Sequence, residues 1–116
     1  MGFDKQMIEY RPDKWVVLKI NRDDEVDYKV LGGWKGGYLD GDYWRLNSGI
    51  KEVDVNKDGN YFYFKGHSGS VYGCRKESYG FTVQTAGIYE QLTKNWFPGT
   101  KVEVMPEETD WMELLS

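Results

Sequence analysis

The chain of 116 residues contains one cysteine, three prolines, one histidine and a single alanine, Ala86. Because Cys74 has no second cysteine to pair with, an internal disulfide is excluded, and an unpaired thiol fits a reducing cytoplasm better than secretion. Alanine is the strongest helix former, so its near absence beside 14 glycines favours tight turns over long helices. No apolar run has the length of a membrane span, and residues 1–15 lack the apolar stretch of a signal peptide. We therefore expect a cytoplasmic protein without a membrane segment.

The formal net charge is −4 and the isoelectric point is near 5.0. This balance disfavours general affinity for nucleic-acid backbones or anionic membranes. The excess acid lies mainly in residues 22–27 and 107–116, whereas residues 28–105 hold ten Lys or Arg against eight Asp or Glu. A protein is therefore the favoured partner, and nucleic acid stays open as a less favoured one.

Length and composition predict one mainly β domain spanning residues 1–116, since 40% of the residues are hydrophobic and 16% are aromatic. Segments rich in β-branched and aromatic residues alternate with turn residues at a spacing of roughly 8–12 residues. The predicted strands are 14–21, 27–34, 43–46, 50–55, 60–66, 71–76, 81–85 and 100–105. Seven or eight short strands fit a strongly bent antiparallel sheet, an SH3-like barrel or a sandwich, with one or two short helices near the C-terminus.

Helical spacing appears first in residues 86–96, where Ile88, Leu92 and Trp96 recur every four residues. Thr85 is the predicted N-cap of this helix. Pro106 predicts the start of a second, acidic helix over residues 107–115.

The second predicted helix carries Trp111, Leu114 and Leu115 on one face. We expect this face to dock on the sheet, and the alternative is a contact with a partner.

The stretch DVNKDGN (54–60) begins like a calcium-binding loop, with Asp54, Asn56 and Asp58 alternating before Gly59. The loop pattern requires a glutamate at its twelfth position, where this chain has Lys65, and the flanking residues favour strands over helices. The stretch therefore predicts the turn of a β-hairpin and no metal site.

Cys74 and His67 are the one pair that suggests nucleophilic catalysis. In a hairpin, four intervening strand positions separate them by roughly 13 Å, which is too far for a hydrogen bond. We expect Cys74 to be a small buried hydrophobic residue and His67 a solvated turn residue. No cofactor motif is present, because the glycines of 32–37 lack the phosphate-loop pattern, and a catalytic role is disfavoured.

Aromatic and basic side chains concentrate in residues 34–45. Such side chains stack on bases or sugars, or anchor protein interfaces, whereas most aromatics of a small β domain pack in its core. Tyr43 and Trp44 are adjacent, so in a strand they face opposite sides and at least one is expected to be exposed. The candidate binding residues of this segment are Trp34, Lys35, Tyr38, Tyr43, Trp44 and Arg45.

The segment YFYF (61–64) poses the same choice between two faces of a strand. Tyr61 and Tyr63 are the easier pair to expose because their hydroxyls reach water, which leaves Phe62 and Phe64 for the core. Tyr61 and Tyr63 are therefore candidate binding residues as well.

The segments WVVLKI (15–20), YFYF (61–64) and VYGCRKESYG (71–80) together resemble small uncharacterised bacteriophage proteins, over residues 14–92. The resemblance implies an accessory protein that acts in the host cytoplasm by binding a host protein. Because such proteins mostly lack an assigned activity, it assigns no functional residue.

These observations favour a non-enzymatic binding or regulatory domain that acts through a protein interface. The alternative is a nucleic-acid or carbohydrate-binding module that uses residues 34–45. A small enzyme with an acid-based site is a third hypothesis, which no spacing of carboxylates supports.

Overall fold

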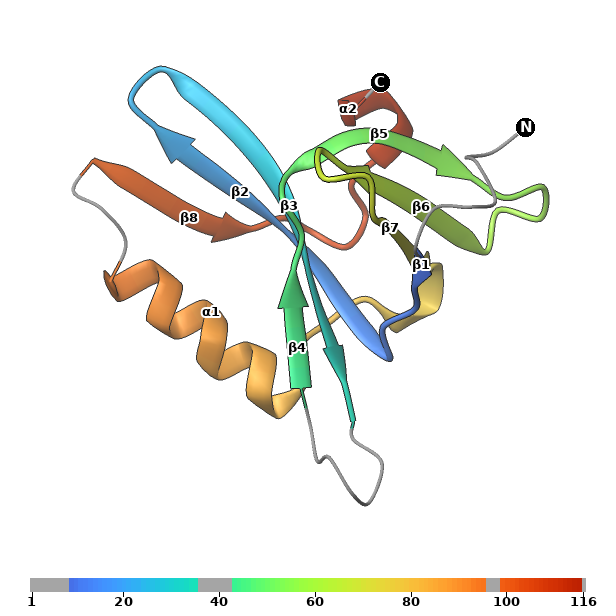
Figure 1. Cartoon of the computed structure of the whole chain (residues 1–116), viewed down its shortest axis with the longest axis horizontal. Coiled ribbons are helices and arrows are strands. Elements are labelled where there is room, and N and C mark those ends of the chain that lie inside the picture. The colour runs from blue at the N-terminus through green and yellow to red at the C-terminus, as the bar shows by residue number, and fades with distance from the viewer. Residues whose placement is uncertain (1–8, 36–42, 96–98, 116) are drawn as a thin grey trace.

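The computed structural model describes residues 9–35, 43–95 and 99–115 (Figure 1). Tyr38, a candidate binding residue, and Trp96, at the end of the predicted helix 86–96, lie outside these residues. In chain order the elements are β1 (Glu9–Tyr10), β2 (Lys14–Arg22), β3 (Glu25–Trp34), β4 (Tyr43–Leu46), β5 (Ile50–Val55), β6 (Tyr61–Gly66), β7 (Val71–Arg75), η1 (Lys76–Ser78), α1 (Val83–Asn95), β8 (Thr100–Val104) and α2 (Trp111–Leu115).

The strands of the described residues form two four-stranded sheets. Sheet A has the order β1-β7-β6-β5, in which β1 pairs parallel with β7 and the other pairs are antiparallel. Sheet B has the order β4-β3-β2-β8 and is antiparallel throughout. Figure 1 shows sheet A on one side of sheet B and α1 on the other. The predicted sandwich is confirmed, and the barrel alternative is wrong because within the described residues the two sheets do not close into one.

Sheet B is the middle layer, which explains why β2 contains four consecutive apolar residues, 15–18, that are all buried. Trp15 and Val17 pack between the two sheets, whereas Val16 and Leu18 pack towards α1. Each of these four side chains is at most 1% exposed. Alternate residues of a strand point to opposite faces, so a strand covered on both faces buries every consecutive side chain.

The predicted hairpin between the first two long strands is confirmed. Arg22 pairs with Glu25 and leaves a two-residue turn of Asp23 and Asp24, with Asp23 at φ 56°. A positive φ at the first turn residue is typical of the two-residue hairpin turns, whose twist matches that of the flanking strands. Aspartate tolerates this conformation.

DVNKDGN forms the predicted turn, between β5 and β6. The side-chain oxygen of Asn56 accepts hydrogen bonds from the backbone N–H groups of Asn60 and Tyr61, at 2.8 and 3.0 Å. Gly59, at φ 76°, donates its N–H to the carbonyl of Asn56. The loop thus uses Asn56, one of the three alternating oxygen donors, to close the hairpin.

The structure corrects the strand predicted at 81–85 and the cap predicted at Thr85. α1 begins at Val83, and its N-cap is Thr82, whose Oγ1 accepts the N–H of Thr85 at 3.0 Å. Thr85 Oγ1 in turn accepts the N–H of Thr82 at 2.8 Å. Each threonine satisfies a free N–H of the helix start, as in a capping box, and this local bonding outweighs the β propensity of FTVQT.

The C-terminal segment docks on the core, as predicted, but its helix begins later than expected. Residues 106–109 form a turn, and α2 starts at Trp111, with the Asp110 carboxylate accepting the N–H of Glu113 at 3.1 Å. Trp111 is 2% exposed and Leu115 packs against the core, whereas Leu114, which was expected to dock with them, is 38% exposed. Neither helix of the described residues is long and apolar enough to cross a membrane.

Candidate binding surface

Trp34 and Tyr43 form a stacked aromatic pair at the surface. They are partners in the register of β3 and β4, and their rings stack in parallel with centroids 4.9 Å apart. The Trp34 indole N–H donates to the carbonyl of Arg11 at 2.9 Å. Trp34 is thus fixed by a neighbouring ring and a hydrogen bond, while the Tyr43 side chain remains 44% exposed.

Arg45 continues this surface along β4. Its guanidinium lies 4.4 Å from the ring centroid of Tyr10, within the range of a cation–π interaction. Tyr10 also meets the edge of Trp34, at 6.4 Å, and contacts Tyr72 at 5.3 Å. The two-residue strand β1 therefore joins the aromatic pair of sheet B to sheet A.

The outer face of β6 carries Tyr61 and Tyr63, as predicted, while Phe64 is fully buried and Phe62 packs against the core. The two tyrosine rings stack 6.2 Å apart. Gly73 lies opposite Tyr63 in the register, and a Cβ there would approach the tyrosine ring to 3.2 Å. The glycine makes room for Tyr63 on this face.

Two arginines flank Tyr61. The guanidinium of Arg11 lies 5.5 Å from the Tyr61 ring centroid and that of Arg75 lies 5.9 Å from it. Glu9 forms an ion pair with Arg11 and raises the pKa of its guanidinium, mainly through the hydrogen bond between them. A small hollow of about 200 Å³ opens here, lined by Arg11, Pro12, Asp13, Tyr61, Gly73, Arg75 and Ser78.

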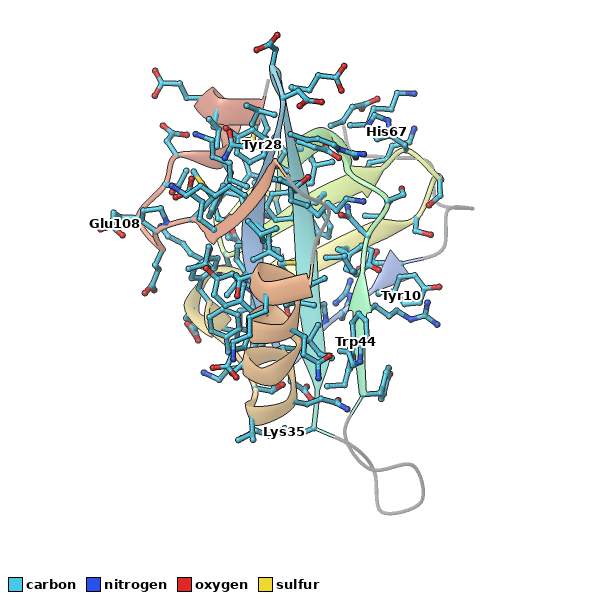
Figure 2. The ribbon with its side chains drawn as sticks, turned by 90° about the vertical axis from the view of Figure 1, so that its left-hand side faces the viewer. Tyr10, Tyr28, Lys35, Trp44, His67 and Glu108 are labelled. Carbon is cyan, nitrogen blue, oxygen red and sulfur yellow. The ribbon has the colours of Figure 1, made fainter. Side chains whose placement is uncertain are left out.

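These side chains form one surface, which we name the aromatic–arginine band. It runs from β4 over β1 to the outer face of β6 and consists of Tyr10, Arg11, Trp34, Tyr43, Arg45, Tyr61, Tyr63 and Arg75. Its sheet B residues, Trp34, Tyr43 and Arg45, lie at the end of β3 remote from the acidic β2–β3 turn. Figure 2 shows Lys35, Trp44 and Tyr10 in one half of the molecule and Tyr28 in the other.

Five of the eight predicted binding residues belong to the band: Trp34, Tyr43, Arg45, Tyr61 and Tyr63. Lys35 is exposed at the end of β3, where its backbone N–H donates to Asp13 at 2.8 Å. Trp44 is 38% exposed but, by strand alternation, faces the α1 side with Gly33 as its register partner. Tyr43 and Trp44 thus face opposite sides, as expected, and both are exposed because β4 is an edge strand.

Three band residues escaped the sequence analysis: Tyr10, Arg11 and Arg75. Tyr10 and Arg11 adjoin Pro12 in a segment without strand periodicity, and Arg75 ends an otherwise apolar strand. The one sequence pattern that points to them is the tyrosine next to an arginine at 10–11. It becomes meaningful only when β1 is known to pair with β7.

Cys74 and His67, the pair considered for nucleophilic catalysis, lie in different environments in the structure. Cys74 is fully buried in the core, where burial raises the pKa of its thiol well above the ordinary value, and its Sγ lies 3.7 Å from the Tyr72 carbonyl. His67 lies in the exposed β6–β7 turn. Within the part of the chain that the structure describes, no three His, Cys, Asp or Glu side chains gather as a metal site requires.

The fold and the band together define a small mainly β domain with an exposed aromatic and basic surface. No family model, curated protein or solved structure matches the chain. The function is therefore inferred chiefly from the chemistry of this surface.

Proposed function

We propose that this protein is a non-enzymatic binding or regulatory domain whose aromatic–arginine band is the contact surface for a protein partner. The observation that carries the proposal is the convergence of exposed and partly exposed tyrosine, tryptophan and arginine side chains from five strands, β1, β3, β4, β6 and β7. These three residue types dominate the binding free energy of protein interfaces. The resemblance to small bacteriophage proteins supports a host protein in the cytoplasm as the partner.

The internal contacts of the band favour binding because they fix side chains before a partner arrives. Trp34 is held by Tyr43 and by the Arg11 carbonyl, and Arg45 is held over Tyr10. Immobilising a flexible side chain at an interface costs about 0.5–1.5 kcal/mol. A surface whose side chains are already ordered retains more of its contact energy as affinity.

The paired change Tyr43→Ser and Arg45→Ala tests the proposal. Each residue is exposed on an edge strand, so the fold is expected to survive, while the affinity for a partner captured from host lysate should fall by about tenfold or more. Arg22→Ala is the matched control, because Arg22 is also exposed but lies at the opposite end of the β2–β3 hairpin. Dissociation constants measured by calorimetry with the purified partner decide the outcome. Equal affinity of the band variant and the control would refute the proposal.

A nucleic-acid or sugar ligand is the second candidate, and the position of Tyr61 between two guanidinium groups favours it. Aromatic rings stack on bases, and neighbouring arginines neutralise the charge of the phosphates. Glu9 and Asp13 beside the same arginines, and the net charge of −4, oppose it. Tryptophan fluorescence titrated with oligothymidylate and with an oligosaccharide separates the candidates, with Trp34→Phe as the control. A saturable change that Trp34→Phe abolishes supports this candidate, and an unchanged signal rejects it.

A further inference from the structure

A second concave site lies under the segment that connects β8 to α2. It is a cavity of about 550 Å³ that shares no lining residue with the aromatic–arginine band. Its lining consists of Trp15, Phe62, Lys76, Tyr79, Glu107, Glu108, Thr109, Asp110 and Trp111. This volume falls in the range of small-molecule sites, which are about 300–1,000 Å³.

Four aromatic rings form the inner wall of the cavity. Tyr79 meets Trp15 edge-on at 4.7 Å and lies 5.9 Å from Trp111, while Phe62 lies 6.4 Å from Trp15. Trp15 and Trp111 are at most 2% exposed and form the floor, whereas Phe62 and Tyr79 are partly exposed and form the sides. Aromatic ring faces carry partial negative charge and attract cations.

The polar ends of two of these rings are already satisfied inside the protein. The Trp15 indole N–H donates to the carbonyl of Arg75 at 2.7 Å. The Tyr79 hydroxyl donates to the carbonyl of Met105 at 2.6 Å and accepts the N–H of Val17 at 3.1 Å. Neither polar group is available to a ligand, so Trp15 and Tyr79 present only the apolar carbon atoms of their rings to the cavity.

The rim of the cavity is acidic. Glu107, Glu108 and Asp110 contribute three carboxylates against the single ammonium of Lys76, which leaves a formal charge of −2 (three negative, one positive). Figure 2 shows Glu108 on the outer side of this segment. The pKa of Tyr79 is raised to about 12, chiefly by burial, with the Glu107 charge as a further cause, so this carboxylate acts on the cavity wall.

We propose that this cavity binds an organic cation, an ammonium or guanidinium group on an apolar stem. The stem would lie against the aromatic rings and the charged group would lie among the carboxylates of the rim. An anion would meet net repulsion at the rim. A neutral apolar ligand would displace water from the carboxylates without offering them a hydrogen bond or a positive charge in its place. Only a cation with an apolar body matches both the walls and the rim.

The test uses the full chain and two ligands that differ in charge alone. Nα-acetyl-arginine amide should bind saturably, as followed by tryptophan fluorescence and amide chemical shifts, while its neutral isostere Nα-acetyl-citrulline amide should not. The paired change Glu107→Gln and Glu108→Gln should weaken binding by about fivefold, since each exposed charge contributes modestly. Glu113→Gln is the matched control, because Glu113 is an exposed acid on α2 outside the lining, and it should leave the affinity unchanged. Asp110 is retained in every variant because it caps α2.

A tripeptide Gly-Arg-Gly distinguishes two sources of the cation. Tighter binding of the peptide than of the amide assigns the site to an arginine side chain of a partner, and equal or weaker binding assigns it to a free small cation; either result supports the proposal. Equal binding of the citrulline compound, equal loss in Glu113→Gln, or no saturable signal at millimolar ligand would overturn it. Tyr43→Ser with Arg45→Ala should not alter this binding, so failure of the cation site and failure of the band are distinguishable.

Discussion

Gly33 is a residue at which sheet B and the start of α1 are in close contact. It lies on β3 beneath the start of α1, and a Cβ at this position would lie 2.7 Å from Thr85 Cγ2 and 2.8 Å from Thr82 Cγ2. Real Cβ atoms do not approach other atoms so closely, and these threonines are themselves buried and bonded to one another. Gly33 therefore sets the distance between α1 and sheet B.

Gly33→Ala is expected to destabilise the protein by about 1–3 kcal/mol, the usual range for overpacking a close-packed site. The midpoint of urea unfolding, followed by far-ultraviolet circular dichroism, measures the change. Gly87→Ala is the control within α1, since a Cβ there meets nothing within 4 Å. That substitution should stabilise by roughly 0.5–1 kcal/mol because alanine restricts the unfolded chain and favours helix. A Gly33→Ala protein as stable as the wild type would contradict the packing described above.

At the same scale, the sequence predicts which way a side chain faces but not what it meets. Alternation correctly places Phe62 and Phe64 in the core and Tyr61 and Tyr63 outside. It cannot show that Arg11 lies over Tyr61, because that contact joins residues fifty positions apart through the pairing of β1 with β7 and of β7 with β6. Three of the eight band residues, Tyr10, Arg11 and Arg75, therefore could not be predicted from the sequence.

At the scale of elements, the accuracy of prediction depends on how local the stabilising contacts are. The β2–β3 and β5–β6 hairpins are predicted because turn residues and strand patterns lie next to each other in the chain. The start of α1 is missed because FTVQT has strand propensity, and the reciprocal bonds of Thr82 and Thr85 decide in favour of a helix. The capping pattern Thr82-x-x-Thr85 uses threonine where glutamate or glutamine is usual, so its signal is weak.

The edge strand β4 is a regular element whose large side chains remain exposed. Its four residues pair with the end of β3 and leave Tyr43, Trp44 and Arg45 exposed. The sequence favours core packing for most of these aromatics because large rings are usually buried. An edge position has a covering neighbour on one side only, and this follows from the strand order, which no local pattern contains.

At the scale of the whole molecule, Tyr79 joins the two cores. Its ring packs against side chains on both faces of sheet B, and its hydroxyl links β2 to the residue after β8. The sequence predicts two helices and about eight strands, yet it does not predict a residue between η1 and α1 that holds three layers together. Such a role depends on the arrangement of all the layers at once.

This position of Tyr79 makes the stability of the protein depend on pH in the alkaline range. Burial raises the pKa of Tyr79 to about 12 in the folded state, against an ordinary value of 10.0. The unfolded chain therefore loses this proton first as the pH rises. The resulting stabilisation is complete below pH 10 and is lost progressively between pH 10 and about 12, because the unfolded state binds fewer protons there. The ionised phenolate would also lose its hydrogen bond to the Met105 carbonyl.

Tyr72, whose pKa burial likewise raises to about 12, contributes in the same direction, so a substitution is needed to isolate Tyr79. Tyr79→Phe should be less stable than the wild type at pH 8, by about 1–2 kcal/mol for the lost hydrogen bonds. The phenylalanine variant has no proton to lose at this position, so the difference in unfolding free energy between the two proteins should shrink from pH 8 to pH 11.5. Urea unfolding of the two proteins at several pH values measures this difference. A gap between wild type and Tyr79→Phe that is unchanged at pH 11.5 would show that the Tyr79 hydroxyl titrates alike in the folded and unfolded chain, and so that it does not lie in the buried junction between the two cores.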